Sequence, residues 1–200
     1  MTKDNSKNFL NYDSFDNENF ISLKMISQNL ASRSFYQCTF KKCDFTGSNL
    51  SDCFFSDCTL ESANLSLVKI ENTKLQNIFF HECKISGVNF SVVNTLLLKV
   101  RFEDCLISEC NFTTLPLQET GFRNCRIHNC DFYQAILAGA DFSGSDLKES
   151  LFENTDLSKA NFSEARNYII NPLTNKIKKA RFSLPEAMVL LHSFDIILGE

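Results

Sequence analysis

The most reactive side chains in this 200-residue chain are nine cysteines and three histidines. A thiolate can act as a nucleophile, a metal ligand or half of a disulfide, and a histidine can act as a base or a ligand. Every cysteine, however, stands two positions before a large apolar residue, as in FYQCTFKKCDF (35–45) and FRNCRIHNCDF (122–132). The tightest spacing is C-x₄-C, whereas metal sites favour C-x₂-C pairs. The pattern therefore predicts buried, free, structural thiols, which behave as small hydrophobic groups.

Catalysis is not expected from the remaining reactive residues. His81, His128 and His192 are scattered along the chain, and the first two follow large apolar residues, so they should point to solvent. There is no Ser-His-Asp or Cys-His constellation, no phosphate-binding loop and no pair of inward carboxylates. We expect a non-catalytic protein without catalytic residues, cofactor or metal.

Composition gives weaker guidance on partners and location. The net charge is −4, from 24 acidic and 20 basic residues, so no direct nucleic-acid binding is expected. The first residues have no secretory signal, and no apolar run reaches the roughly 18–20 residues that span a bilayer. Nine cysteines without such a signal favour a reducing compartment. These features predict a cytoplasmic protein with no membrane contact.

The elements that position the cysteines follow a five-residue period. Large apolar residues recur at every fifth position from Phe35 to Phe90, and again from Leu97 to Phe162 after a two-residue shift within 91–96. This period fits neither a strand (2.0) nor an α-helix (3.6). Two positions before the large residue stands, in most units, a small residue or a thiol, and the position directly before it is often Asp or Asn. Each unit therefore offers two inward and three outward side chains, as in a chain that turns a corner every five residues.

Residue identity also sorts by every fourth unit, which predicts coils of 20 residues. One column is nearly all Phe, another is mostly aliphatic, and like residues are expected to stack along the interior. The column with the most leucines includes the first large residue after the shift, so Leu97 is expected inside. Its members are Phe35, Phe55, Leu75, Leu97, Leu117, Leu137 and Leu157.

The units AGADFSGSDL (138–147) and TDLSKANF (155–162) resemble the A(D/N)Lxx pattern of pentapeptide-repeat proteins. The resemblance implies an all-β fold, a right-handed quadrilateral β-helix. We assign residues 1–14 to an N-terminal tail and 15–166 to the β-helix, with the insertion near 91–96. Residues 167–200 are assigned to a C-terminal cap.

The cap is predicted from local signals. NYIINPLTNKIKKARF (167–182) suggests two short strands in a hairpin around an Asn-Pro turn. Ser183 and Glu186 form an S-x-x-E capping box before a short amphipathic α-helix, and SFDIILGE (193–200) resembles a strand. A cap is needed because an open β-helix end exposes unpaired backbone. Its apolar surplus predicts pairing with a second copy through Leu184, Met188, Leu191, Phe194, Ile196, Ile197 and Leu198, although capping without dimerisation stays open.

Two outer surfaces are candidates for a partner. The first is an apolar stripe around the insertion, comprising Leu96, Leu98, Pro116 and Ile136. The insertion could also be a tolerated bulge, and the first 30 residues could fold back over the stripe. The second is an anionic face that includes Asp141, Asp146 and Asp156. The alternative for these acids is an ordinary solvated face that reflects the repeat's preference for Asp.

A second resemblance concerns the C-terminal segment. INPLTNKIKKARFSLPEA (170–187) followed by an apolar strand resembles the gyrase-protecting branch of the family, which includes quinolone-resistance and microcin-immunity proteins. That resemblance implies a head-to-head dimer and a rod that imitates DNA in shape and charge. The chain departs from it in lacking long loops and in its modest charge. The expected function is protection of a type II topoisomerase such as DNA gyrase or topoisomerase IV from a poison. The alternative is a structural adaptor that docks another protein through the apolar stripe.

Overall fold

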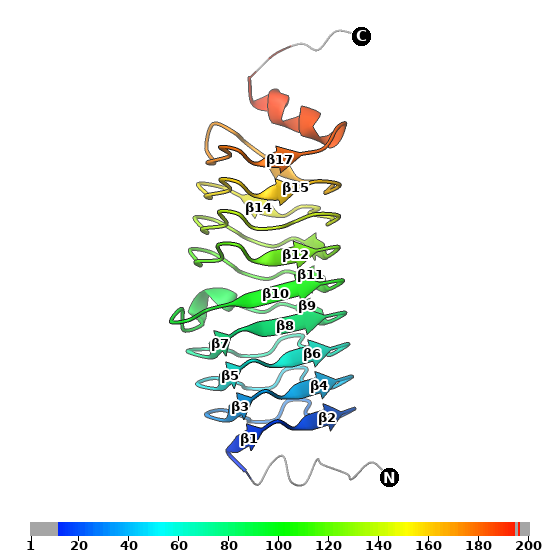
Figure 1. The fold of residues 1–200 in the computed structure, drawn as a ribbon, viewed down its shortest axis with the longest axis vertical. Helices are drawn as coiled ribbons and strands as arrows, with labels where there is room; N and C mark the ends of the chain where they lie inside the picture. Colours follow the sequence, from blue (N-terminus) through cyan, green and yellow to red (C-terminus); the bar gives the residue numbers. More distant parts are fainter. Residues whose placement is uncertain (1–11, 195, 197–200) are drawn as a thin grey trace.

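The chain winds into a four-sided rod in which each coil lies on the previous one (Figure 1). The computed structural model describes residues 12–194 and 196. Neighbouring coils pair in parallel with an offset of 20 residues, as in Phe35↔Phe55 and Phe40↔Leu60. The predicted all-β, four-sided β-helix is therefore confirmed, since four sides of five residues make one coil.

Three sides of the rod carry the regular strands. The first side holds β1 (Ser14–Asp16), β3 (Ser34–Tyr36), β5 (Phe54–Ser56) and β7 (Lys74–Gln76). The second holds β2 (Asn19–Ile21), β4 (Thr39–Lys41), β6 (Thr59–Glu61), β8 (Ile78–His81), β10 (Val100–Glu103) and β12 (Gly121–Arg123). The third holds β9 (Lys84–Ser86), β11 (Leu106–Ser108) and β13 (Arg126–His128). Near the C-terminal end, β14 (Leu151–Phe152) pairs with β16 (Ile169–Ile170), and β15 (Asn161–Phe162) pairs with β17 (Arg181–Phe182).

A left-handed backbone residue turns most corners, and this explains the period of five. It stands two positions after the large inward residue, as in Asn17, Asn77 and Asn124 with φ of 53°, 54° and 52°. In the described part of the chain, 27 non-glycine residues have positive φ, against four glycines. Such a conformation is strained for most residues. The corner amide still donates to the next coil, as from Asn17 to the carbonyl of Tyr36 at 2.9 Å, so the backbone ladder offsets part of that strain.

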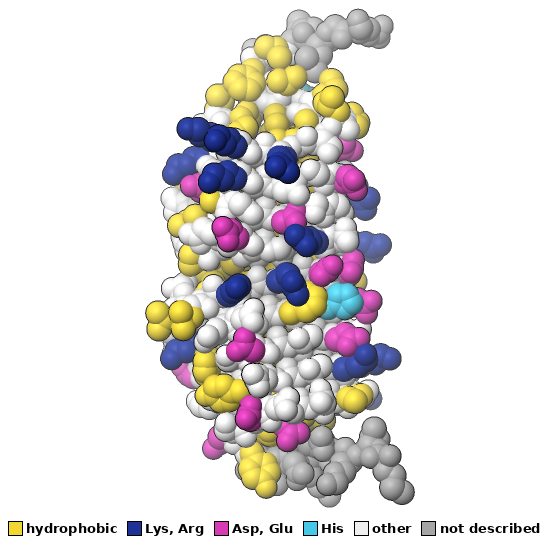
Figure 2. All heavy atoms as spheres, viewed as in Figure 1, with side chains coloured by type: hydrophobic (Ala, Val, Ile, Leu, Met, Phe, Trp, Pro, Cys, Tyr) yellow, Lys and Arg dark blue, Asp and Glu magenta, His cyan; other side chains and the backbone are white. Residues whose placement is uncertain are grey.

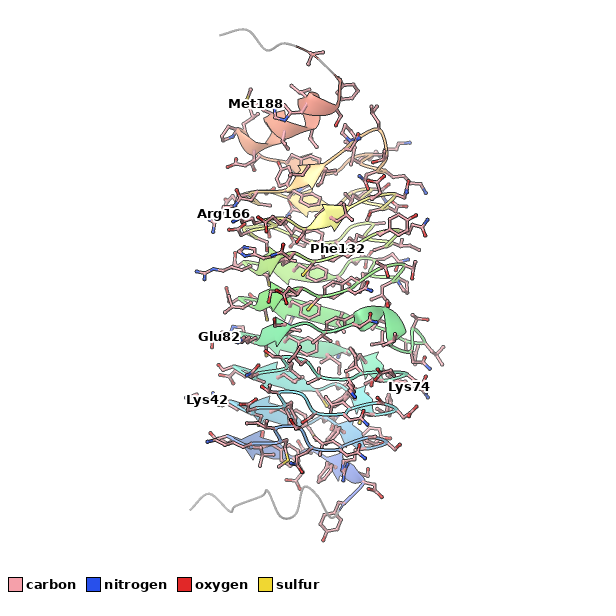
Figure 3. The ribbon with its side chains drawn as sticks, turned by 180° about the vertical axis from the view of Figure 1, so that it is seen from behind. Lys42, Lys74, Glu82, Phe132, Arg166 and Met188 are labelled. Atoms are coloured by element: carbon pink, nitrogen blue, oxygen red, sulfur yellow. The ribbon has the colours of Figure 1, made fainter. Side chains whose placement is uncertain are left out.

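The large inward residues stack in columns, as the sequence predicts. Phe102 lies parallel to Phe80 and Phe122, with ring centroids 4.9 and 5.0 Å away. A second column contains Phe112 and Phe132, and rings of the two columns meet edge to face, at 86° between Phe112 and Phe122. Stacked and edge-to-face contacts between rings add to the burial of apolar area. Figure 3 shows Phe132 inside the rod and Arg166 projecting from its side.

The small inward position supplies hydrogen-bond donors between coils. The thiol of Cys53 donates to the carbonyl of Leu30 at 3.1 Å. Hydroxyls do the same elsewhere, since Thr73 Oγ1 donates to Leu50 O at 2.7 Å. A buried carbonyl without a partner would cost roughly 1–3 kcal/mol. A thiol or hydroxyl at this position therefore both fills the space and donates, whereas an alanine or an aliphatic residue such as Ile78 only fills it.

All nine cysteines are buried and free, as predicted. Burial raises the pKa of Cys43 and of Cys53 to about 11, with neighbouring backbone hydrogen bonds acting in the opposite direction. A thiol with such a pKa stays protonated near neutral pH and is a poor nucleophile. Cys43 and Cys53 are therefore unreactive near neutral pH, and the burial of all nine cysteines makes them part of the core.

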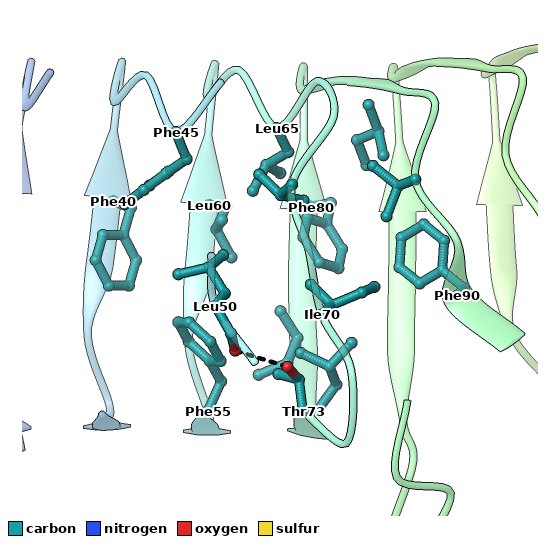
Figure 4. Close-up of a pocket in the computed structure, with 15 residues that line it drawn as sticks. Phe40, Phe45, Leu50, Phe55, Leu60, Leu65, Ile70, Thr73, Phe80 and Phe90 are labelled. Carbon is teal, nitrogen blue, oxygen red and sulfur yellow. Dashed lines mark hydrogen bonds between the residues drawn. The ribbon is translucent and has the colours of Figure 1, made fainter. Parts of the chain in front are cut away.

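The interior contains a small apolar cavity of about 40 Å³ where the aromatic columns are interrupted (Figure 4). Leu60 stands between Phe40 and Phe80, and Leu50 and Leu65 lie nearby. Leucine fills less volume than phenylalanine in a stack of this spacing. The cavity therefore marks a place where the interior of these coils is less closely packed.

The two-residue insertion lies at 95–98, later than most of the predicted interval. Asn94 still pairs with Lys74 at an offset of 20, whereas Val100 pairs with Ile78 at an offset of 22. The prediction that Leu97 faces inward is wrong, because its side chain is 65% exposed and Leu98 packs against the core instead. Leu97 has φ of 61° and so occupies a corner.

The rod extends at both ends beyond the regular sequence pattern. Strands β1 and β2 pair with β3 and β4, so the segment from Ser14 to Ser32 forms a first coil and does not fold back over an outer surface. At the other end the expected hairpin does not form, because β16 and β17 pair with β14 and β15 in a last coil. Asn175 fills its small inward position, accepting from Thr155 N and donating to Phe152 O, each at 2.9 Å.

A short helix, η2 (Glu186–Phe194), covers the C-terminal end of the rod. It is a 3₁₀-helix rather than the expected α-helix. The Ser183 hydroxyl accepts a hydrogen bond from Glu164 N across the coils at 3.1 Å, a contact the expected capping box does not foresee. Val189 and Leu190 pack against the core. The predicted C-terminal strand at 193–200 lies largely outside the described residues.

Candidate functional site

The insertion forms an exposed apolar loop, here called the leucine loop and comprising residues 95–98. Leu96 and Leu97 are 67% and 65% exposed, while Leu98 anchors the loop to the core. A tight turn closes it, since Leu98 N donates to Thr95 O at 3.2 Å. It follows η1 (Phe90–Val92) and projects from the side of the rod in Figure 1. Two adjacent exposed leucines on an anchored loop can contact an apolar surface of a partner.

The predicted apolar stripe is only partly formed. Pro116 and Ile136 are neighbours in adjacent coils, and Ile136 is 39% exposed. Leu98 is partly buried against the core and lines the groove described below, and Asn94, not Leu96, pairs with Lys74 of the preceding coil. Leu96, Leu97 and Ile136 are exposed apolar residues of this side, and Pro116 beside Ile136 is partly buried.

A groove of about 480 Å³ borders the leucine loop and was missed from the sequence. Its floor includes Phe79, Arg101 and Gly121, which lie opposite one another in β8, β10 and β12. The Arg101 guanidinium lies 3.9 Å above the Phe79 ring. A Cβ on Gly121 would stand 3.2 Å from Arg101 Cγ, so glycine allows the arginine to lie flat. The two-residue insertion, which aligns Phe79 with Arg101 at an offset of 22, was the feature of the sequence that could have indicated this groove.

The predicted anionic residues are engaged within the repeat. Asp141 Oδ1 accepts from Ser143 N at 3.1 Å, and Asp156 Oδ1 accepts from Ser158 N at 3.0 Å. This bond to the amide two residues on explains why Asp and Asn precede the large residue so often. Asp141 also accepts from Arg123 Nε at 2.6 Å.

The other two aspartates also have cationic neighbours. Asp146 lies 3.2 Å from Arg166, and Asp156 lies 3.8 Å from Lys176. Burial raises the pKa of Asp141 and of Asp146, but hydrogen bonds from Ser143 and Arg123 to the former, and from Asn167 and Arg166 to the latter, outweigh it, so both lie below the usual value. The carboxylates are thus charged but locally neutralised.

The last coils are not acidic overall, which differs from the predicted anionic face. Residues 131–165 contain seven acidic residues and two bases, Lys148 and Lys159. The last coil adds five bases, so 131–181 contains seven acids and seven bases. The added bases are Arg166, Lys176, Lys178, Lys179 and Arg181.

The C-terminal helix presents an apolar outer side. Leu184 and Met188 are 78% and 44% exposed, and Phe194 and Ile196 are about half exposed. Leu191 is half-buried, and Ile197 and Leu198 lie outside the described residues. The predicted dimerisation residues that are described therefore form one exposed end.

Other reactive groups do not assemble into a centre. His81 and His128 are half-buried beside Asp104 and Asp146, rather than fully solvated. Within 12–194 and 196, no three His, Cys, Asp or Glu side chains cluster as metal ligands. No helix of that part is long and apolar enough to cross a membrane.

Comparison with known proteins identifies the repeat. The family model described as "Pentapeptide repeat region" matches residues 33–112 and 93–162, which together exceed half the chain. No curated protein matches the chain. Among solved structures, a trypsin-treated variant of QnrB1, a plasmid-mediated fluoroquinolone resistance protein, is similar at 18% identity and a TM-score of 0.57. A second trypsin-treated QnrB1 variant is similar at 18% identity and a TM-score of 0.53. Each of the two alignments covers 92% of this chain and 89% of the QnrB1 chain. At this identity the likeness concerns the fold, and the family match establishes that this chain belongs to the pentapeptide-repeat proteins.

Proposed function

We propose that this protein is a non-catalytic binding protein that engages a type II topoisomerase, DNA gyrase or topoisomerase IV, and relieves its inhibition by a poison. The observation that carries the proposal is the leucine loop, which places two exposed leucines on the side of a rigid rod. The fold similarity to a fluoroquinolone resistance protein supports the choice of partner. A filled interior leaves side chains on the outer surface to do the binding.

The leucine loop and the adjacent groove supply the contacts in this proposal. Leu96 and Leu97 would enter an apolar depression of the enzyme, and Arg101 at the groove would pair with an acidic side chain. The shape of the rod contributes, but the aspartates contribute less than their number suggests, because neighbouring bases balance Asp141, Asp146 and Asp156. Binding should therefore depend mainly on the loop and only moderately on salt.

The proposal is tested by gyrase supercoiling in the presence of a fluoroquinolone or a gyrase-poisoning peptide. Purified protein should restore supercoiling, and Leu96→Asp/Leu97→Asp should raise the concentration required at least tenfold. The matched control is Leu106→Asp/Leu151→Asp, which changes two leucines that are about half exposed outside the loop. It should act like the wild type. If wild-type protein neither binds the enzymes nor restores activity with either poison, the proposal is wrong.

The exposed leucines also favour a second candidate, an adaptor that docks a different protein through the leucine loop and the Pro116–Ile136 pair. Its binding would be apolar and should persist at high salt. A pull-down from the native host at 0.1 M and 0.5 M salt, comparing wild type with Leu96→Asp/Leu97→Asp, distinguishes the candidates. Recovery of a loop-dependent partner other than a topoisomerase at both salt concentrations would favour the adaptor.

We also propose that two copies associate through the exposed end formed by Leu184, Met188 and Phe194. Burying these side chains removes apolar area from water at roughly 25 cal/mol per Å². A symmetric pairing would place the same patch on both partners. It would also prevent uncontrolled stacking of rods at that end.

A further inference from the structure

A cluster of bases surrounds one corner at the C-terminal end of the rod, and we call it the basic corner. Every member is exposed. Figure 2 shows lysine and arginine side chains gathered at this end, beside the uppermost strands. The basic corner comprises Lys159, Lys176, Lys178, Lys179 and Arg181.

The coil register brings these residues together. Lys159 N donates to Lys178 O at 2.9 Å, which places the two residues in adjacent coils. Lys159 and Lys179 are both corner residues with φ of 62°, and they are 20 residues apart, so one lies over the other. Lys176 and Lys178 flank Ile177, which is partly buried against the core, so both point outward. Arg181 begins β17 on the next side of the rod.

Few acids balance this charge. Lys176 is 3.8 Å from Asp156, and among the described residues no ion pair is formed by Lys159, Lys178, Lys179 or Arg181. Stacked coils lie about 4.8 Å apart. Like charges at that spacing repel one another, so the corner is less stable than a mixed arrangement. An anion with several charges would relieve the repulsion.

We propose that the basic corner binds the phosphate backbone of duplex nucleic acid without regard to sequence. Lysine ammonium groups act as mobile point charges toward phosphates. Lys176 pairs with Asp156 of the preceding coil, Lys178 stands in the turn that follows, and Lys159 and Lys179 extend the cluster along the rod axis. A duplex offers a regular row of charges to such a cluster. The corner contains no groove or side-chain array suited to base edges.

This inference runs against the expectation of no nucleic-acid contact, which rested on the net charge of −4. A bound phosphate senses charges within about a Debye length, roughly 10 Å at 0.1 M salt. Residues 166–181 contribute four of the five bases and contain no acidic residue, so the last coil is locally positive. The inference goes beyond the proposed topoisomerase protection and does not depend on it.

The test is fluorescence anisotropy of two unrelated fluorescein-labelled 20-base-pair duplexes with full-length protein at 50–200 mM NaCl. Both duplexes should bind equally, with Kd on the order of 10⁻⁵ M at the lowest salt. Lys178→Gln/Lys179→Gln should weaken binding at least fivefold and reduce the slope of log K against log salt by about 2, because each phosphate contact contributes about 0.9. The matched control Lys69→Gln/Lys84→Gln removes two exposed lysines elsewhere and should change neither value.

The inference is overturned if wild-type protein does not bind at 50 mM NaCl, or if both double variants lose affinity equally. It is also overturned if phosphatidylserine vesicles bind with the expected dependence on Lys178 and Lys179 while the duplexes do not. Supercoiling protection, measured in parallel, should be unchanged in Lys178→Gln/Lys179→Gln. Failure of one activity therefore leaves the other independently testable.

Discussion

Phe122 and Phe142 lie 20 residues apart in the chain, yet their rings are parallel to within 2° and their centroids are 5.0 Å apart. Both side chains are fully buried. The contact exists because the coil repeats at the spacing of parallel strands, so successive rings meet near their optimal distance.

Truncating one ring should be costly. Phe122→Ala removes contacts with Phe102 and Phe142 and leaves a cavity, so it should lower the free energy of unfolding by about 3–5 kcal/mol. Urea denaturation followed by circular dichroism measures this loss. Phe54→Ala, at a half-buried outward position, is the control and should cost much less. Equal losses for the two variants would contradict the stacked core.

Filling the interior cavity should stabilise the rod. Leu60→Phe would continue the column from Phe40 to Phe80, and the 40 Å³ cavity corresponds to about 1 kcal/mol at 24 cal/mol per Å³. Leu60→Ala should lose about 2–5 kcal/mol. Thermal unfolding of both variants against wild type provides the measurement. Destabilisation by phenylalanine would mean that the surrounding leucines cannot move aside.

Thiol reactivity should report the closed interior. A thiol reagent at pH 8 should modify almost none of the nine cysteines in folded protein and all of them in guanidinium. Because the folded pKa of Cys43 and Cys53 is about 11, above the usual 9.0, their contribution to stability is present below pH 9 and is lost as pH rises from 9 to 11. The urea midpoint should fall over that window. Rapid modification of several thiols in the folded state would disagree with this structure.

Acid should weaken the paired aspartates. The folded pKa of Asp141 lies below the usual 3.8, so its contribution is present above that value and is lost as pH falls through the folded pKa. Asp141→Asn removes the charge that faces Arg123 and should flatten the decline of the urea midpoint between pH 5 and pH 2. Asp16→Asn, an exposed residue of the first coil, is the control. An unchanged decline in Asp141→Asn would show that its ion pair contributes nothing measurable.

The exposed C-terminal end should determine the oligomeric state. Wild-type protein should elute with a light-scattering mass of twice 22.8 kDa, and Leu184→Asp/Met188→Asp should return it to 22.8 kDa. Leu173→Asp changes another exposed leucine of the last coil and should leave the dimer intact. A monomeric wild-type protein at 100 µM would contradict the proposed dimer.

The five-residue pattern was enough to predict the coil, the inward cysteines and the stacked phenylalanines, because each follows from one period. It could not locate the insertion, since Leu96, Leu97 and Leu98 are equally apolar and only backbone pairing shows which one is anchored. The last coil was also hidden. Its inward position is Asn175, a polar residue whose burial is possible only because Thr155 and Phe152 satisfy it.

The outer surface was predicted less well for a related reason. Asp141 and Asp156 were predicted either to form an anionic face or to reflect the repeat's preference for Asp. Each accepts a hydrogen bond from the backbone amide two residues on, which is the physical reason for that preference. The groove at Phe79, Arg101 and Gly121 could be predicted only if the 22-residue offset between Phe79 and Arg101 was known. Surface properties depend on which coils become neighbours, and a single shift changes every pairing that follows.

The left-handed corners constrain the backbone more than the side chain. A corner requires a positive φ, and residues as different as Leu67, Lys42 and Glu119 adopt it. Mutation can therefore exchange the outward residues of one coil while the inward pair remains untouched. Related rods can therefore acquire new partners through substitutions of surface residues, with little effect on folding.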